Sequence, residues 1–229
     1  MRRSLLICIL AFLVMLPGTA PPAAADTGQL KDESQDLVQS SAATFGSFMT
    51  DREFTWFHEN LSKAKALLIF PKIIKAGFFW GGSGGNGVLV VRDERTGEWS
   101  QPAFYSIGSV SLGLQIGAED AEVIMFGMSR KAIDSLYASS FKFGAETSVA
   151  AGPRGLGAKK VLTADFLSFA KARGLYAGLD LEGSGIMVRD DLNRAYYGKE
   201  LRPIQIILER TVSNEHSRTL LDALKKAGK

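Results

Sequence analysis

The sequence has few of the residues that support covalent or metal chemistry. It contains one cysteine, Cys8, and two histidines, His58 and His216. Because Cys8 lies in a segment that we expect to be removed, the rest of the chain has no thiol for a disulfide or a nucleophilic step. No cluster of His, Cys, Asp and Glu has metal-ligand spacing. We therefore predict no metal ion and no cofactor.

The first 25 residues have the three parts of a secretory signal peptide. Arg2 and Arg3 form its positive start, Leu5 to Leu16 its apolar stretch, and Ala23 to Ala25 a small-residue cleavage site. The apolar stretch is too short to span a bilayer comfortably. We expect cleavage near Ala25 and a periplasmic or secreted protein that can associate with a membrane peripherally.

Excess charge of either sign is also missing once this segment is set aside. Arg2 and Arg3 are its only charged residues, so the 27 basic residues of the chain fall to 25, against 24 acidic ones. A generally cationic surface is excluded, although a local cationic patch is not. The remaining 204 residues suit one fairly large domain better than two.

Hydrophobic periodicity predicts an α+β fold with N-terminal amphipathic helices. Residues 26–60 form a helical segment, in which Leu37, Phe45, Phe48 and Met49 share one apolar face after a polar stretch over 26–34. Residues 61–210 form a mainly antiparallel, curled or barrel-like sheet flanked by helices. Residues 211–229 form a charged helix or tail.

Local residues set the expected boundaries inside the sheet region. Pro71 should end a strand over 66–70, because proline cannot donate to the ladder. Ser129 should cap a helix over 129–139. The short apolar or aromatic runs at 193–198 and 204–208 are interpreted as further strands.

A glycine-rich segment occurs twice. KAGFFWGGSGGNGVLVVRD covers residues 75–93, and a similar layout, RGLYAGLDLEGSGIMVRD, covers residues 173–190. Glycine inside strands suits bends and close backbone approaches. The two copies therefore predict related corners of one curled sheet.

The first copy also matches two catalytic patterns, but in the wrong context. Residues 81–85 satisfy G-x-S-x-G, and residues 82–87 satisfy G-x-G-x-x-G. Both patterns require a helix after the glycines, whereas a strand follows here, and no histidine is placed to activate Ser83. A glycine turn is the favoured interpretation, and a hydrolase that uses Ser83 is a remote alternative.

Two groups of basic residues could meet an anion. Arg154, Lys159 and Lys160 follow glycines in GPRGLGAKK, which is either an anion contact or a solvated turn. Lys63, Lys65, Lys72 and Lys75 fall among aromatic residues, an arrangement that suits an anionic lipid headgroup above an acyl boundary. The alternative is ordinary lysines around core aromatics. Nucleic acid is not an expected partner of an exported protein.

The apolar face of the first helix has two interpretations as well. Leu37, Phe45, Phe48 and Met49 either pack on the domain's own core, which is the usual fate of such a face, or lie on a membrane surface. The polar face is not rich in lysine or arginine, unlike that of most interfacial helices.

The segment from about Leu61 to Leu208 closely resembles the SYLF domain family. The resemblance is carried by AKALLIFPKIIKAGFFWGGSGGNGVL, GEWSQPAFYSIGSVSLGLQIGAE, KFGAETSVAAGPRG, ARGLYAGLDLEG and NRAYYG, in the family's order. It implies a non-enzymatic domain that binds lipid, phosphoinositides included, and in eukaryotic members regulates actin. In those members an amphipathic N-terminal helix and nearby basic residues contact the membrane. Leu37 to Met49, with Lys72 and Lys75, occupy the matching places here.

The expectation from sequence is thus a lipid-binding protein of the bacterial cell envelope. It would contact anionic lipid through the apolar helix face and the four lysines over residues 63–75. The alternative is a structural or protein-interaction module without direct lipid binding. Actin is not expected as a partner of an exported protein.

Overall fold

The computed structural model describes residues 27–77, 80–112, 117–152, 163–172, 181 and 183–228, with the backbone alone at 76–77, 80–81, 110–112 and 117–119. Three of the features expected from the sequence lie outside these ranges. They are the signal peptide over 1–25, the anion contact of Arg154, Lys159 and Lys160, and residues 173–180 of the second glycine-rich segment.

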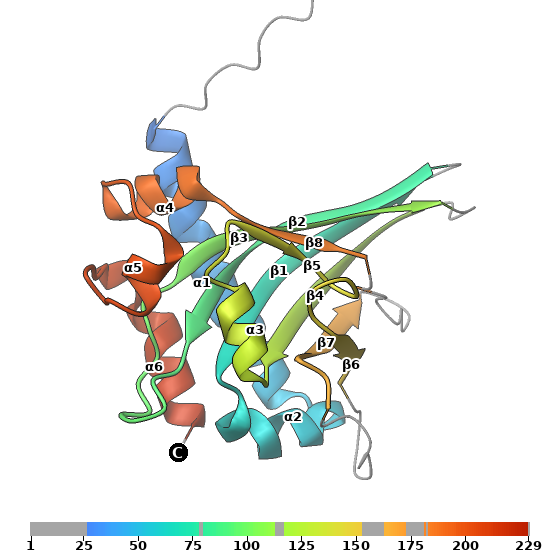
Figure 1. Ribbon diagram of the computed structural model, residues 1–229, viewed down its shortest axis with the longest axis horizontal. Coiled ribbons are helices and arrows are strands. Elements are labelled where there is room, and N and C mark those ends of the chain that lie inside the picture. Colours follow the sequence, from blue (N-terminus) through green and yellow to red (C-terminus); the bar gives the residue numbers. More distant parts are fainter. Residues whose placement is uncertain are drawn as a thin grey trace, which may run out of the picture.

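One curled, mostly antiparallel sheet organises the described chain (Figure 1). Its order is β5-β8-β3-β2-β1-β4-β7-β6, and the β6–β7 pair is parallel. The strands are β1 (Ala66–Gly77), β2 (Trp80–Val91), β3 (Ala103–Leu112), β4 (Gly117–Gly127), β5 (Ser140–Lys142), β6 (Val149–Ala151), β7 (Phe166–Ala172) and β8 (Gly185–Val188). The outermost strands β5 and β6 are joined by a short connection, in which Phe143 forms an isolated bridge with Thr147. The two edges of the curled sheet therefore approach each other there.

Helices cover both faces of this sheet. They are α1 (Thr27–Thr50), α2 (Thr55–Asn60), α3 (Arg130–Ser135), α4 (Asp190–Tyr197), α5 (Pro203–Ile207) and α6 (Arg218–Ala227), with single 3-10 turns at Arg52–Phe54, Leu61–Lys63 and Glu215–Ser217. The inner face of the curl packs on α3 and α5. The outer face packs on α1, α2, α4 and α6. The structure confirms the α+β fold that the sequence predicts.

Strand β1 shows how one strand serves two cores. Leu68 and Phe70 point to the inner core, whereas Leu67 and Ile69 point to the outer one, and all four are fully buried. Alternate residues of a strand face opposite sides of a sheet, so a strand covered on both faces reads as a continuous apolar run. Helices α1 and α6 also share the outer core, to which they contribute Val38 and Leu220. The helical segments at the two ends of the chain thus share a core with the sheet.

Pro71 does not end β1, contrary to the sequence prediction. The strand continues to Gly77, and its register against β4 shifts between Phe70 and Ile73. A bulge leaves part of the ladder unpaired, so a residue without an N–H group is tolerated there.

The glycine-rich run lies inside β2, so the expected turn over residues 81–87 is wrong. A Cβ atom at Gly85 would lie 2.2 Å from the carbonyl oxygen of Lys72, and one at Gly87 would lie 2.4 Å from that of Ile69. These two glycines therefore allow β2 to approach β1 closely beside the bulge.

Several expected boundaries change, each for a local reason. Helix α1 already begins at Thr27, so the polar stretch over 27–34 is part of the same helix as the apolar face. Residues 193–197 belong to α4, which Gly198 ends in a left-handed conformation (φ 72°). Residues 204–207 belong to α5, which has a proline in its first turn. Ser129 caps α3 as predicted and accepts a hydrogen bond from the Ala132 N–H at 3.0 Å.

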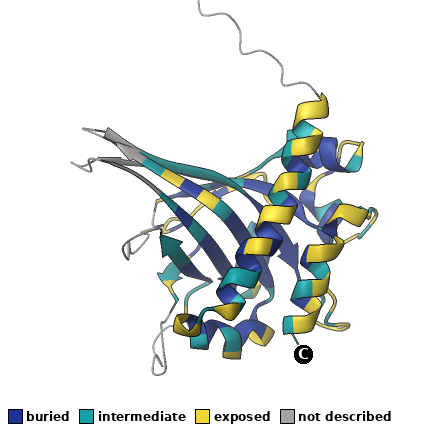
Figure 2. Cartoon of the chain, turned by 180° about the vertical axis from the view of Figure 1, so that it is seen from behind, coloured by how far each residue is buried: buried dark blue, intermediate teal, exposed yellow. Residues whose placement is uncertain are grey.

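Figure 2 shows the outer face, where α1 lies diagonally across the sheet with its buried residues toward the strands. Among the described helices, none combines the length and apolar character needed to cross a bilayer.

Candidate functional site

The apolar face of α1 is docked on the sheet. Phe45 and Phe48 are 1% and 0% exposed, and the Phe48 ring lies 4.6 Å from that of Phe54, centroid to centroid. Leu37 and Met49 are partly buried against the same core. In this conformation the face therefore packs on the protein itself, and the two phenylalanines offer no surface to lipid.

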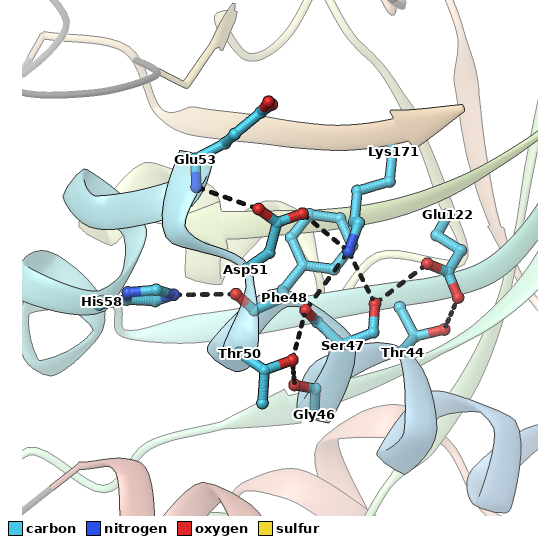
Figure 3. A network of polar contacts seen from close by, with 10 residues as sticks. All are labelled: Thr44, Gly46, Ser47, Phe48, Thr50, Asp51, Glu53, His58, Glu122 and Lys171. Carbon is cyan, nitrogen blue, oxygen red and sulfur yellow. Dashed lines mark hydrogen bonds and ion pairs between the residues drawn. The ribbon is translucent and has the colours of Figure 1, made fainter. Parts of the chain in front are cut away.

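Polar side chains of β4 and β7 hold the C-terminal end of α1 (Figure 3). Lys171 Nζ lies 3.0 Å from Asp51 Oδ2 and donates to the Ser47 carbonyl oxygen at 3.3 Å. A cation at this end of a helix also interacts favourably with the helix dipole. Glu122, which pairs with Lys171 across the two strands, accepts hydrogen bonds from Thr44 at 3.0 Å and Ser47 at 3.2 Å.

A second polar network holds the N-terminal half of α1. Asn86, inside the glycine run of β2, donates to Glu33 Oε1 at 3.1 Å and accepts from Arg189 Nη1 at 2.8 Å. Arg189 also donates twice to Asp191, at 2.8 and 2.7 Å. This pairing raises the pKa of Arg189 and lowers that of Asp191. The helix is thus tied to the sheet at both ends.

The four lysines predicted to bind lipid do not form one patch. Lys63 donates to Asn60 Oδ1 at 2.7 Å, and Lys65 is ion-paired with Glu94, both near the start of β1. Lys72 and Lys75 lie toward the other end. Ten residues of strand separate Lys65 from Lys75, a span of about 33 Å. One lipid headgroup cannot contact both pairs.

Lys72 and Lys75 also lie on opposite faces of the sheet. Lys72 is on the outer face beside α1, with Nζ 3.4 Å from Asp120 Oδ2. Lys75 shares the inner face with Ile73 and lies between two strands. On the β2 side it is opposite Ser83, whose Oγ is 2.8 Å from Ser109 Oγ, and on the β4 side it is opposite Glu119. Directly opposite residues have Cβ atoms about 5 Å apart. We call Lys75, Ser83 and Ser109 the inner row.

The inner row can bind an anion. A lysine ammonium supplies three donors and a positive charge. In the Ser83–Ser109 hydrogen bond one hydroxyl donates, so the other hydroxyl can turn its proton toward an acceptor. Hydrogen bonds from such groups to an ionised oxygen are stronger than neutral ones. The row therefore suits a phosphate or carboxylate at the surface of the inner face.

Ser83 does not have the setting of a catalytic serine. It lies within β2, paired with β1 and β3, rather than on a strand-turn-helix that would aim its hydroxyl. His58 is engaged elsewhere, with Nε2 2.9 Å from the Phe48 carbonyl oxygen. In the described part of the chain, no group of three or more His, Cys, Asp or Glu residues could hold a metal ion.

Sequence reasoning missed the groups that tie α1 down. Glu122, Lys171, Asn86 and Arg189 come from four strands or their ends, and the Arg189–Asn86 contact spans 103 residues. No local pattern signals such contacts. Only the pairing of neighbouring strands could have suggested that Glu122 and Lys171 are adjacent.

These features define a class of protein, a half-barrel α+β domain. The inner row on its described surface can bind an anion. The chain belongs to the Ysc84 family, also known as the SYLF domain family. The matching family model is described as "Las17-binding protein actin regulator" and covers residues 108–227, more than half of the chain.

Curated relatives agree with this assignment. The chain is 36% identical over 144 residues to an SH3 domain-containing protein of Schizosaccharomyces pombe, covering 60% of this chain and 33% of that protein. It is 33% identical over 145 residues to protein YSC84 of Saccharomyces cerevisiae, with 60% and 31% covered. It is 31% identical over 169 residues to human SH3 domain-containing YSC84-like protein 1, with 72% and 49% covered.

The chain thus spans between about a third and a half of the length of these relatives. No solved structure matches it.

Proposed function

We propose that this protein binds anionic membrane lipid, without catalysis, through the end of the sheet where β1 to β4 run past the helices (Figure 1). We call this part of the four strands the projecting end; it lies beyond Pro71 in β1, before Val88 in β2, after Phe104 in β3 and before Val123 in β4. The observation that carries the proposal is the inner row, which places a lysine beside two serine hydroxyls on this end. Family membership and the lipid binding that the SYLF resemblance implies agree with it.

Lys75 is the main cation in this proposal. A basic residue near an anionic membrane surface contributes about 1 kcal/mol to binding. Lys72 contributes less, because Asp120 already neutralises it and Asp32 and Asp36 of α1 line the cavity beside it. Lys63 and Lys65 are too distant to join Lys75 on one patch of lipid.

Helix α1 remains docked in this proposal. Removing a phenylalanine from a core costs about 3–5 kcal/mol, and α1 would withdraw both Phe45 and Phe48 if it left the sheet. The helix therefore positions the sheet rather than inserting into lipid.

Co-sedimentation with phosphatidylserine-containing vesicles at low salt tests the role of Lys75. We expect Lys75→Gln to weaken binding about fivefold, the factor that corresponds to 1 kcal/mol. Lys63→Gln is the matched control and should bind like the unsubstituted protein. Equal losses for the two variants, or no vesicle binding by the unsubstituted protein, would reject the inner row as the lipid site.

Neighbouring serines of α1 allow the docking of the helix to be tested. Ser41 is 0% exposed, whereas Ser40 is exposed. In a Cys8→Ser background, we expect a thiol reagent to label Ser40→Cys at least tenfold faster than Ser41→Cys, with vesicles or without, because the packed interior excludes the reagent. If vesicles made Ser41→Cys as reactive as Ser40→Cys, the helix would leave the sheet on binding, as in the membrane-surface alternative.

We also propose that the protein acts in the bacterial cell envelope, after export and removal of residues 1–25. The support is the signal-like order of charge, apolar stretch and small residues. Mass spectrometry of the exported protein should find Asp26 at its start. We do not extend Las17 binding or actin regulation to this chain, because an exported protein would meet neither.

A further inference from the structure

The outer face of the projecting end is a sheet surface with almost no side-chain cover. Ile74, Gly84, Gly108 and Gly185 lie in register across β1, β2, β3 and β8. A Cβ atom at any of these three glycines would have only a neighbouring strand's carbonyl oxygen within 4 Å, at 3.5 to 3.9 Å. The space above them is therefore open.

Two of the large apolar side chains that are exposed in the described chain border this surface. Ile74 is 48% exposed and Met187, which pairs with Ser106 in the next row, is 52% exposed. Elsewhere on the outer face, helices bury such residues. Exposed apolar side chains beside bare backbone are typical of a surface that another molecule covers.

Helix α1 forms a wall along this surface. A cavity of about 520 Å³ lies between Asp32, Glu33 and Asp36 of the helix and Pro71, Lys72 and Asn86 of the sheet. A second cavity, of about 410 Å³, shares Pro71 and Lys72 with the first and continues past Asp120 to Lys171. We call the two cavities, together with the adjoining row from Ile74 to Gly185, the outer groove.

The charge of the outer groove is negative. Five carboxylates line the two cavities, against two lysines. Lys72 is paired with Asp120, and Lys171 with Asp51. Asp32 and Asp36 are exposed and lie one turn apart on α1. Neither has an ionic partner among the residues that the structure describes. Such a surface repels anionic lipid and attracts cations.

We propose that the outer groove binds a cationic segment of a partner protein. Its lysine or arginine side chains would face Asp32 and Asp36, and its apolar side chains would lie on the glycines beside Ile74. Because glycine has no side chain, these apolar groups can approach the strand backbone directly. This interaction is independent of the lipid contact, since the inner row lies on the opposite face of the sheet.

Fluorescence anisotropy with the purified protein tests this proposal. The probe is a labelled decapeptide of alternating lysine and leucine, with alternating glutamate and leucine as the control peptide. We expect the lysine peptide to bind and the glutamate peptide not to bind. Asp32→Asn with Asp36→Asn should weaken binding about tenfold, since two exposed charge pairs are lost. Glu59→Gln with Glu146→Gln changes the net charge equally at exposed sites elsewhere and should have no effect.

Gly84→Val tests the floor of the groove without changing charge. Its side chain would fill the open space above the glycines, so the lysine peptide should no longer bind, while the urea midpoint should not fall. Vesicle binding should persist in this variant and in the aspartate double variant. Equal peptide affinity in all variants, or the same loss in the Glu59/Glu146 control, would overturn the proposal. So would loss of vesicle binding in the groove variants, which would make the groove a lipid surface.

Discussion

The four central strands differ sharply between their two halves. In the packed half, Leu67 to Phe70 of β1 and Val88 to Val90 of β2 are fully buried between helices on both faces. In the projecting end, the same strands carry glycine, serine, lysine and an exposed Ile74, and Ile73 beside the bulge is still buried. Both halves are paired strand to strand, so backbone hydrogen bonds do not distinguish them. The comparison indicates that the packed half provides stability. The projecting end, which helices do not cover, provides surfaces for recognition.

The boundary between the halves lies at the bulge of β1. Pro71 sits in the bulge, and Gly85 and Gly87 bring β2 against it. The composition of β1 and of β2 changes at this point, from apolar to glycine-rich or charged. Over residues 72–75 and 82–87, whose side chains the structure describes, the strands therefore continue past the helices without exposing a long apolar surface.

The largest effect should come from a core residue of the packed half. We expect Phe48→Ala to lower the free energy of unfolding by about 3–5 kcal/mol, because it leaves a cavity in a fully buried cluster. Ile74→Ala in the projecting end should change it by less than about 1 kcal/mol. Urea unfolding measures both. If the two variants lost a similar free energy of unfolding, the packed half would not be more important for stability than the projecting end.

Alanine substitutions of two adjacent glycines at the boundary, Gly84 and Gly85, should change the free energy of unfolding in opposite directions. Gly85→Ala places a Cβ against the Lys72 carbonyl oxygen, so β1 and β2 must separate, at a cost of about 1–3 kcal/mol. Gly84→Ala makes only an ordinary contact, with the Ile107 carbonyl oxygen at 3.5 Å, and should be neutral or stabilise the fold by up to about 1 kcal/mol, because alanine restricts the unfolded chain. Thermal unfolding distinguishes them, and equal destabilisation by both would argue against a bulge-specific contact.

A smaller effect on stability should follow from removing the Lys171 contacts that hold the C-terminal end of α1. Lys171→Met removes the ion pair with Asp51 and the hydrogen bond to the Ser47 carbonyl oxygen. We expect a loss of about 1–2 kcal/mol in the free energy of unfolding. Lys142→Met, at an exposed position on β5, is the control and should lie within about 0.5 kcal/mol of the unsubstituted protein. If both variants unfolded at the same urea concentration, the Lys171 contacts would add nothing to the docking of α1 on the sheet.

Much of the fold could be predicted from the sequence, because it depends on local pattern. The period of Leu37, Phe45 and Phe48 predicted α1, and Ser129 marked the start of α3. Short segments gave wrong predictions, as at 193–198 and 204–208, because a few apolar or aromatic residues within five or six positions fit a buried strand or a helix equally well. Pro203 and Gly198 carried the deciding signal there, as a helix start and a helix stop.

Less of the candidate site could be predicted. Lys63, Lys65, Lys72 and Lys75 are close in sequence, yet an extended strand separates the two pairs and places Lys72 and Lys75 on opposite faces. Residues distant in sequence form the functional surfaces instead. Ser83 meets Ser109, and Asn86 meets Glu33 and Arg189.

The sequence by itself determined the α+β class, the amphipathic first helix and the family, since periodicity, caps and motifs act over a few neighbouring residues. Only the tertiary structure decided that α1 turns its phenylalanines into the core, that the glycine run is a strand, and that Lys72 and Lys75 lie on opposite faces of the projecting end. The physical reason is strand register. Pairing between distant segments sets which side chains share a face, and no local pattern specifies that pairing.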